Sequence, residues 1–201
     1  AELTKISLGG NNLKDEGVTI VCDALRNSKV SKLNELELWG NNITITGAKS
    51  VAAYLAVTAS LTTLNLSNND LCGLDYRGRG TYTAEGIKAI ADALRVSAEL
   101  TKISLGGNNL KDEGVTIVCD ALRNSKVSKL NELELWGNNI TITGAKSVAA
   151  YLAVTASLTT LNLSNNDLCG LDYRGRGTYT AEGIKAIADA LRVSAELTKI
   201  S

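Results

Sequence analysis

The sequence predicts an α/β solenoid: a right-handed, horseshoe-shaped stack of strand–helix units with parallel strands on the concave face and helices on the convex face. Residues 98–194 repeat residues 1–97 letter for letter, and residues 195–201 begin the same sequence a third time. Each copy holds three lines with the apolar alternation of a strand, and each line precedes a segment with the apolar spacing of a helix. Repetition at a fixed period is typical of stacked repeats, and parallel strands joined by helices cross over right-handedly.

Each predicted strand lies in a line with the pattern L-x-x-L-x-L-x-x-N-x-L, which is the leucine-rich repeat pattern. Leu3 begins the first line, and apolar residues alternate around Ile6, so that one face of a short strand points inward. The following lines begin at Leu33, Leu61 and Leu100, after intervals of 30, 28 and 39 residues. We therefore expect one solenoid over residues 1–201, with blocks 1–97 and 98–194, repeats starting at 3, 33, 61 and 100, 130, 158, and a partial repeat over 195–201.

An asparagine follows each predicted strand, where the chain turns towards its helix. A side-chain amide there can donate to and accept from backbone groups that the turn leaves unpaired. Stacked turns then produce a structural ladder of buried asparagines. Its expected members are Asn11, Asn41, Asn69, Asn108, Asn138 and Asn166.

The predicted helices follow these turns and contain residues 17–25, 47–55 and 86–94, with their images in the second copy. The side chains best suited to cap their amino-terminal ends are those of Asp15, Thr46 and Thr83. One aligned helix position is always small, which lets helix and sheet approach closely; it is occupied by Cys22, Ala52 or Ala91. We interpret Cys22 as a small core residue and not as a nucleophile or metal ligand.

The leucine line ending in asparagine, followed by a helix that begins with glycine and ends in Ala-Leu, closely resembles the ribonuclease-inhibitor-like leucine-rich repeats. That class includes ribonuclease inhibitor, the repeat domains of NOD-like receptors and the Ran GTPase-activating protein. The resemblance covers the whole chain except one insertion. It implies a scaffold that binds proteins through its concave face and the neighbouring loops, and the matching residues are framework residues. The identical copies indicate a recent duplication, an engineered array or a slice of a longer array.

The composition argues against catalysis and metal binding, and against nucleic acids and membranes as partners. Histidine is absent, which removes Ser-His, Cys-His and His-metal arrangements, so we expect no catalytic residue, no metal site, no cofactor and no enzyme activity. Lys+Arg and Asp+Glu are both 21, which gives no basic surplus for nucleic acid or anionic membranes. The longest apolar run is far too short to span a membrane. Four dispersed cysteines favour a reducing, cytoplasmic location.

The first candidate binding surface is the predicted concave face. Lys5 and Glu35 share one strand position, so they can form an ion pair on neighbouring strands, and Glu37 occupies the next position on the same face. Such a pair is also an ordinary solvated feature of small energetic value. Trp39 follows the strand where the aligned residues are Gly9 and a serine, so the fold does not require a large ring there. Trp39 is either an interface residue or a cover for Gly9, Gly40 and the asparagine turn.

The second candidate is the insertion over residues 72–83, which separates Leu71 from its helix. It contains Tyr76, Arg77, Arg79 and Tyr82, and tyrosine and arginine are enriched in interfaces. Alternatively, the loop folds back on the solenoid, with packed tyrosines and an ion pair between Asp75 and an arginine. Glycines at 73, 78 and 80 permit unusual backbone turns. An arginine in this loop also has the form of a GTPase-activating finger, which is a weaker interpretation.

The function we predict from the sequence is a non-catalytic protein-binding scaffold that uses both surfaces. A self-assembling or designed array is the alternative, because no capping repeat is present and head-to-tail stacking of copies can run open-ended. A GTPase regulator is a weaker alternative. The expected partner is another protein or a second copy of the chain. The partner-binding residues in the second copy are Lys102, Glu132, Glu134, Trp136, Tyr173, Arg174, Arg176 and Tyr179.

Overall fold

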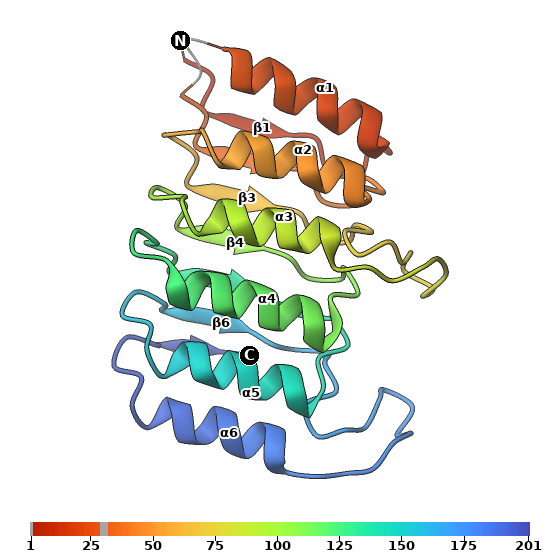
Figure 1. Ribbon diagram of the computed structural model, residues 1–201, viewed down its shortest axis with the longest axis vertical. Helices are drawn as coiled ribbons and strands as arrows, with labels where there is room; N and C mark the ends of the chain where they lie inside the picture. The colour runs from red at the N-terminus through yellow and green to blue at the C-terminus, as the bar shows by residue number, and fades with distance from the viewer. Residues whose placement is uncertain (1, 29–31) are drawn as a thin grey trace.

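The computed structural model describes residues 2–28 and 32–201, which form six helices and seven strands in strict alternation (Figure 1). The strands are β1 (Lys5–Ser7), β2 (Glu35–Glu37), β3 (Thr63–Asn65), β4 (Lys102–Ser104), β5 (Glu132–Glu134), β6 (Thr160–Asn162) and β7 (Lys199–Ile200). The helices are α1 (Lys14–Asn27), α2 (Ile45–Leu55), α3 (Glu85–Leu94), α4 (Lys111–Asn124), α5 (Ile142–Leu152) and α6 (Glu182–Leu191).

The strands form one parallel sheet in which each strand pairs with the next in the sequence. The register repeats without a slip: Lys5 lies opposite Glu35, Glu35 opposite Thr63, and Thr63 opposite Lys102, where the second copy starts the same series again. A constant register aligns identical positions of successive repeats along the stack. Side chains at one strand position therefore form a row across the face of the sheet.

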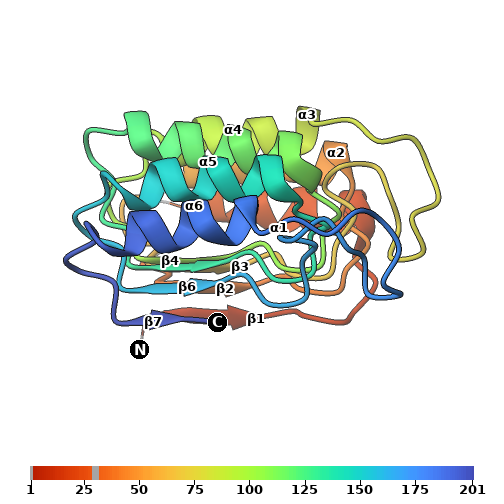
Figure 2. The same cartoon turned by 90° about the horizontal axis from the view of Figure 1, so that it is seen from below.

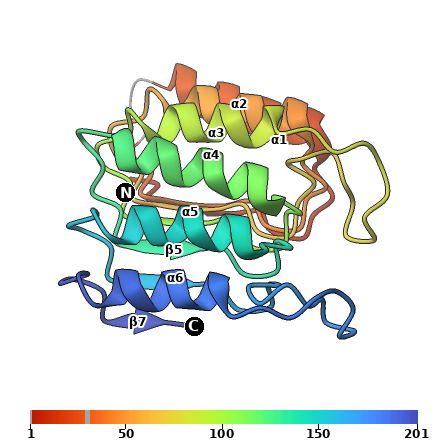
Figure 3. The same ribbon diagram turned by 60° about the horizontal axis from the view of Figure 1, so that its bottom comes forward.

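The helices cover one face of the sheet and leave the other face open (Figure 2). The stack bends into an arch, in which β1 and β7 lie lower than β3 and β4 and the helices follow the outer side. Figure 3 shows the same two layers from an oblique angle. Helices need about 8–10 Å of lateral spacing and strands about 4.8 Å, so the helix layer must lie on the longer, convex side. The predicted α/β solenoid is confirmed.

The core lies between the two layers and consists mainly of leucine, isoleucine, valine and alanine. The middle residue of each inner strand, such as Leu36 or Leu64, has no solvent exposure. Cys22, Ala52 and Ala91 are buried at the aligned helix position, as predicted for small residues that allow close approach. Burying each large aliphatic side chain contributes about 1.5–3 kcal/mol, so neighbouring repeats stabilise one another through this shared core.

The helix caps differ from the sequence prediction. Asp15 lies inside the first turn of α1 and does not cap that helix. Its carboxylate instead accepts hydrogen bonds from the backbone N–H groups of Thr44 (2.7 Å) and Gly47 (3.0 Å), at the start of α2. Thr46 also lies inside α2 and makes no cap bond. The N-cap of α3 is Ala84 and not Thr83, although the Thr83 hydroxyl accepts a hydrogen bond from the N–H of Glu85, the first residue of the helix, at 3.3 Å.

The asparagines that follow the strands connect each turn to the one before it. The Oδ1 atom of Asn41 accepts hydrogen bonds from the N–H groups of Asn11 and Leu13, both at 3.1 Å. Its Nδ2 group donates to the carbonyls of Leu8, Leu38 and Trp39. Asn69, in the next repeat, and Asn138, the image of Asn41 in the second copy, each accept the same two hydrogen bonds from the preceding turn. The amides thus pair backbone groups that the turns would otherwise bury unpaired.

The ladder changes where the insertion begins. Asn108 is fully buried and donates to three carbonyls, but its Oδ1 atom accepts no hydrogen bond within the described part of the chain. The backbone of the preceding turn differs from that of the other turns. The residue after the ladder asparagine has a positive φ at Asn12 and Asn42, but Asp70, at the same position, does not. The N–H of Asp70 donates to the Ile43 carbonyl instead. The insertion therefore leaves one acceptor unsatisfied at the junction between the third and fourth repeats.

Candidate protein-binding surfaces

Two rows of polar side chains cross the open, concave face of the sheet. The first row contains Lys5, Glu35 and Thr63, and the second contains Glu37 and Asn65, with images in the next copy. All of these side chains are exposed or half-buried, whereas the strand residues between them are largely or fully buried. The strand alternation therefore directs both rows to the solvent face that the sequence predicted.

Ion pairs connect neighbouring repeats in the first row. The Nζ atom of Lys5 lies 2.6 Å from Oε1 of Glu35, and Lys102 lies 2.7 Å from Glu132 in the second copy. The hydrogen bond from Lys5 lowers the pKa of Glu35, and the bond to Glu132 raises the pKa of Lys102. All four side chains keep substantial solvent contact, so each pair contributes little to stability. The pairs mainly fix where the charges lie.

The second row is not the same in the two copies. The carboxylate of Glu37 accepts a hydrogen bond from Nδ2 of Asn65 at 2.7 Å. Both Asn65 and Asn162 accept a hydrogen bond from the N–H group two residues further on, but Asn162 also accepts one from the hydroxyl of Ser164, and the carboxylate of Glu134 accepts none from the described residues. Within the described residues, identical sequences thus present one carboxylate that accepts a hydrogen bond and one that accepts none.

The indole of Trp39 packs against the preceding repeat and also remains open to solvent. A β-carbon added to Gly9 would lie 2.2 Å from the Cε2 atom of Trp39, so the ring occupies the space that the absent side chain leaves. Trp39 nevertheless keeps 42% of its surface exposed. Trp136 covers Gly106 in the same way. The covering interpretation is therefore right for Gly9, and the ring also lies over Gly10 and not over Gly40, while the interface interpretation of Trp39 stays a prediction.

A hollow of about 420 Å³ lies on the concave face between the two tryptophans. Its walls include Trp39 and Trp136, its floor includes Ser67 and Ser104, and Glu37, Asn65, Lys102 and Glu134 border it. The two floor hydroxyls are 2.6 Å apart and form a hydrogen bond with each other. The hollow thus combines aromatic surface with polar groups that have free bonding capacity, a composition that is typical of interfaces.

The insertion is a compact loop organised by one carboxylate. Asp75 accepts hydrogen bonds from the N–H groups of Arg77 and Arg79, both at 2.9 Å, and from Nε of Arg79 at 2.7 Å. The Arg79 side chain lowers the pKa of Asp75. Leu74 and Gly80 form a single antiparallel bridge. A β-carbon on Gly80 would lie 2.2 Å from the carbonyl oxygen of Gly73, so this closure requires glycine.

The four predicted binding residues of the loop divide into two groups. Arg79 is bound to Asp75, and Tyr82 donates its hydroxyl to the Leu110 carbonyl at 2.8 Å while Lys111 lies 4.6 Å from its ring centroid. These two side chains hold the loop and fix it to the next repeat. Tyr76 is 79% exposed, and Arg77 beside it has no carboxylate within ion-pair distance among the described residues. Arg79 and Tyr82 therefore stabilise the loop, whereas Tyr76 and Arg77 remain on its surface.

The second copy of the loop has the same internal bonds. Asp172 accepts hydrogen bonds from Arg174 N–H (2.9 Å), Arg176 N–H (2.8 Å) and Arg176 Nε (2.8 Å). Tyr173 is 85% exposed, and Tyr179, the image of Tyr82, is 65% exposed because no following repeat covers it here. The shape of the loop therefore depends on its own carboxylate and not on the neighbouring repeat.

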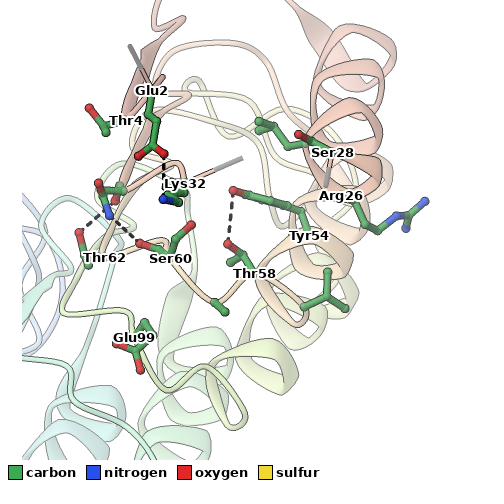
Figure 4. Close-up of a pocket in the computed structure, with 14 residues that line it drawn as sticks. Glu2, Thr4, Arg26, Ser28, Lys32, Tyr54, Thr58, Ser60, Thr62 and Glu99 are labelled. Carbon is green, nitrogen blue, oxygen red and sulfur yellow. Dashed lines mark hydrogen bonds and ion pairs between the residues drawn. The ribbon is translucent and has the colours of Figure 1, made fainter. Parts of the chain in front are cut away.

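A second hollow, of about 650 Å³, lies at the opposite edge of the sheet and was not anticipated from the sequence (Figure 4). Tyr54 and Thr58 lie next to each other in its wall, where the hydroxyl of Thr58 donates to that of Tyr54 at 3.5 Å, and Lys32 forms an ion pair with Glu2 at 2.8 Å. A smaller hollow of about 310 Å³ recurs beside Tyr151. No motif indicates it, because it forms between the carboxyl-terminal ends of two helices and the return loops.

The described cysteines are free and mostly buried. Burial raises the pKa of the thiols of Cys22, Cys72 and Cys119 to about 12 in each case, so these groups are protonated and unreactive near neutral pH. Residues 2–28 and 32–201 contain no group of three or more His, Cys, Asp or Glu side chains arranged to hold a metal ion. Within the same residues, no helix combines the length and apolar character needed to cross a membrane.

Comparison with known proteins agrees with the repeat geometry. Two family profiles match, one described as Leucine Rich Repeat over residues 60–77 and 157–174 and one as Leucine Rich repeat over 3–20 and 97–117. The chain is 30% identical to NACHT, LRR and PYD domains-containing protein 13 of Homo sapiens, over 96% of the chain and 19% of that protein. It is 29% identical to ribonuclease inhibitor of Mus musculus, over 99% of the chain and 39% of the inhibitor.

This chain is a ribonuclease-inhibitor-like leucine-rich repeat protein. It spans only 19% and 39% of the length of the two relatives above. Among solved structures, actin-binding site 2 of leiomodin-1 superposes with a TM-score of 0.58 over 78% of each chain, at 18% identity. That similarity shows that the leucine-rich repeat protein and leiomodin-1 share a fold. Repeat proteins of this kind act generally as protein-interaction scaffolds.

Proposed function

We propose that this leucine-rich repeat protein is a non-catalytic scaffold that binds a protein partner through its concave face, with the inserted loops contributing at the edge. The observation that carries the proposal is the hollow between Trp39 and Trp136, which the two copies build jointly. Neither copy forms this hollow alone, since one wall comes from each. The residues that line the hollow, such as Thr63 and Lys102, belong to the open face of the sheet, which the helices leave uncovered in Figure 2.

The composition of the hollow supports a protein partner. Tryptophan is enriched among the few residues that dominate the binding energy of an interface. Truncation of such a residue to alanine costs about 2 kcal/mol or more of binding free energy. Polar groups around the rings supply directional bonds: the carboxylate of Glu134 accepts no hydrogen bond from the part of the chain that the structure describes, and Lys102, which bonds to Glu132, lies close enough to Glu134 to interact with its charge. The rigid sheet below holds these groups in place before binding, which reduces the entropy lost on association.

Site-specific photocrosslinking tests the proposal. Benzoylphenylalanine replaces Thr63, which borders the hollow, or Lys88, which is exposed on the helix side of the same repeat. After irradiation in a lysate of the source cells, we expect a discrete protein adduct from position 63 and none of comparable yield from position 88. Equal adducts at both positions, or adducts at position 88 alone, would show that the concave face is not the binding surface.

A self-assembling array is the second candidate, and the register of the last strand favours it. Lys199 lies opposite Thr160, as Lys102 lies opposite Thr63, so the third copy enters the sheet in the same way as the second. Further copies would continue the stack and display the same surfaces at a constant interval. Light scattering over a tenfold range of protein concentration tests this candidate: growth in mass supports assembly, and a constant monomer mass contradicts it.

We also propose a reducing compartment such as the cytoplasm as the place of action. Four free cysteines support it, because the described thiols form no disulfide. Mass spectrometry of protein isolated with rapid thiol blocking tests this point. Four blocked thiols are expected, and a native disulfide would contradict the assignment.

A further inference from the structure

The arginine beside the exposed tyrosine of each inserted loop is held in position but makes no ion pair with the described residues. The Nε group of Arg77 donates to the hydroxyl of Tyr76 at 2.7 Å, and the guanidinium carbon lies 5.1 Å from the centre of that ring. Both contacts restrain the guanidinium. They leave its two terminal NH₂ groups unbonded by described residues, in the planar fork geometry that matches a carboxylate.

The same preparation occurs in the second copy, in a different environment. Nε of Arg174 donates to the hydroxyl of Tyr173 at 2.6 Å, and its guanidinium carbon lies 5.0 Å from the ring centre. The first loop is held by the following repeat, through Tyr82 and the Asn109 side chain, whereas the second is not. The arrangement of tyrosine and arginine is therefore a property of the loop sequence itself.

The loop also has the charge that such a ligand requires. Residues 72–83 contain one carboxylate, that of Asp75, and two guanidinium groups. The carboxylate is consumed by Arg79, with the Oδ2 to Nη2 distance at 2.7 Å. One positive charge therefore remains at the tip of each loop, on Arg77 and on Arg174. The opposite arrangement, in which the tip arginine is paired inward, would leave no such charge.

We infer that the Tyr76–Arg77 pair and the Tyr173–Arg174 pair are two identical binding points for carboxylate side chains of an acidic protein segment. The inference rests on the proposed function, since it specifies the chemistry of the partner at the loops. The loops project from the same edge of the stack (Figure 1). Three repeats separate them, which corresponds to about 14 Å at strand spacing and about 30 Å at helix spacing. A single acidic segment can therefore contact both.

Bivalent binding gives the inference a measurable signature. Two weak contacts on one rigid scaffold raise each other's effective concentration when the linker between the acidic clusters spans the two sites. A flexible linker of about 12 Gly/Ser residues has an average end-to-end distance of roughly 20 Å, which suits this separation. The probe is a fluorescein-labelled peptide with two triglutamate clusters joined by that linker. A peptide with one cluster is the monovalent comparison.

Fluorescence anisotropy at low salt measures both peptides against the full chain. We expect the bivalent peptide to bind at least about tenfold more tightly than the monovalent one. Arg77→Ala alone should reduce the bivalent affinity to the monovalent level, and Arg77→Ala with Arg174→Ala should remove binding. Arg77→Lys with Arg174→Lys should weaken it, because lysine keeps the charge but not the fork.

The matched control removes the same net charge elsewhere on the chain. Arg95→Ala with Arg192→Ala deletes two exposed arginines that are also 97 residues apart, at the ends of α3 and α6. This variant should bind like the wild type. The inference is overturned if the control loses as much affinity as the loop variant, if both peptides bind equally, or if inorganic phosphate displaces the peptide where acetate at equal ionic strength does not.

The concave tryptophans separate this inference from the proposed function. Trp39→Ala with Trp136→Ala should leave peptide binding unchanged, because the loop tips do not contact the hollow. Crosslinking at Thr63 without peptide binding would retain the concave scaffold and reject the acidic segment. Peptide binding without concave crosslinking would do the reverse.

Discussion

Replacing two members of the asparagine ladder should have very different costs, although both side chains are fully buried. Asn138 accepts hydrogen bonds from the N–H groups of Asn108 (3.0 Å) and Leu110 (3.2 Å), whereas Oδ1 of Asn108 accepts none from the described residues. The two asparagines each donate to three carbonyls. Asn138→Ala and Asn108→Ala therefore remove the same atoms from equally buried positions.

The difference in cost follows from which backbone groups lose their last partner. Every carbonyl bound by either asparagine keeps another donor: Leu105 is shared by both side chains, and Trp136 still accepts from the N–H of Gly107. In Asn138→Ala, however, the N–H groups of Asn108 and Leu110 become buried donors without an acceptor. Each such group costs about 1–3 kcal/mol. Asn138→Ala should therefore destabilise the protein by at least about 2 kcal/mol more than Asn108→Ala.

Equilibrium unfolding in urea, followed by circular dichroism, measures both free energies of unfolding. Hydrogen exchange adds a local readout, because the amide of Leu110 should lose protection in Asn138→Ala and keep it in Asn108→Ala. Equal costs for the two variants would refute the reasoning. A larger cost for Asn108→Ala would mean that its Oδ1 atom has a partner after all.

Three further predictions concern the tryptophan, the thiols and the loop. Gly106→Ala should expel the Trp136 indole, because the new β-carbon would lie 2.2 Å from the ring; a red-shifted emission in a Trp39→Phe background is expected, and unchanged emission would contradict it. One thiol should react with iodoacetamide at pH 8, and Cys169→Ser but not Cys72→Ser should abolish that reaction, since burial raises the pKa of Cys72 to about 12 while Cys169 is half-buried. The bonds from Arg79 lower the pKa of Asp75, so the loop should stay ordered as pH falls past the ordinary value of 3.8 and loosen only below it. Amide exchange at Arg79 measures this, with Asp75→Asn as the disordered reference; loosening above that pH would contradict the assignment.

The fold could be predicted from the sequence because every repeat contains the same independent signals for a strand, a turn and a helix. The leucine alternation, the asparagine turn and the helical spacing agree with one another six times, and every copy needs the next to bury its apolar face. The helix caps were harder, because the capping carboxylate of Asp15 serves the following helix and not its own. Single-helix rules cannot anticipate a partner 29 residues away.

The candidate surfaces were only partly predictable. Strand alternation was sufficient to place Lys5 and Glu35 on one face, since register follows from the repeat. Composition could not separate Arg77 from Arg79, because both lie in the same Arg-Gly-Arg-Gly segment and only the loop geometry pairs one of them with Asp75. The hollow between the tryptophans was also out of reach, because it depends on how far each ring leans over the preceding repeat.

The central claim is that the concave hollow is the main binding surface. The most direct test is the affinity for the partner that is captured at Thr63. Isothermal calorimetry would compare the wild type with Trp39→Ala plus Trp136→Ala, and with Val57→Ala plus Val154→Ala, which removes two exposed apolar side chains from the return loops that follow α2 and α5. We predict at least about a 30-fold loss for the tryptophan pair, or roughly 2 kcal/mol, and no loss for the valine pair. Unchanged affinity in a folded tryptophan variant, or an equal loss in the valine variant, would contradict the claim.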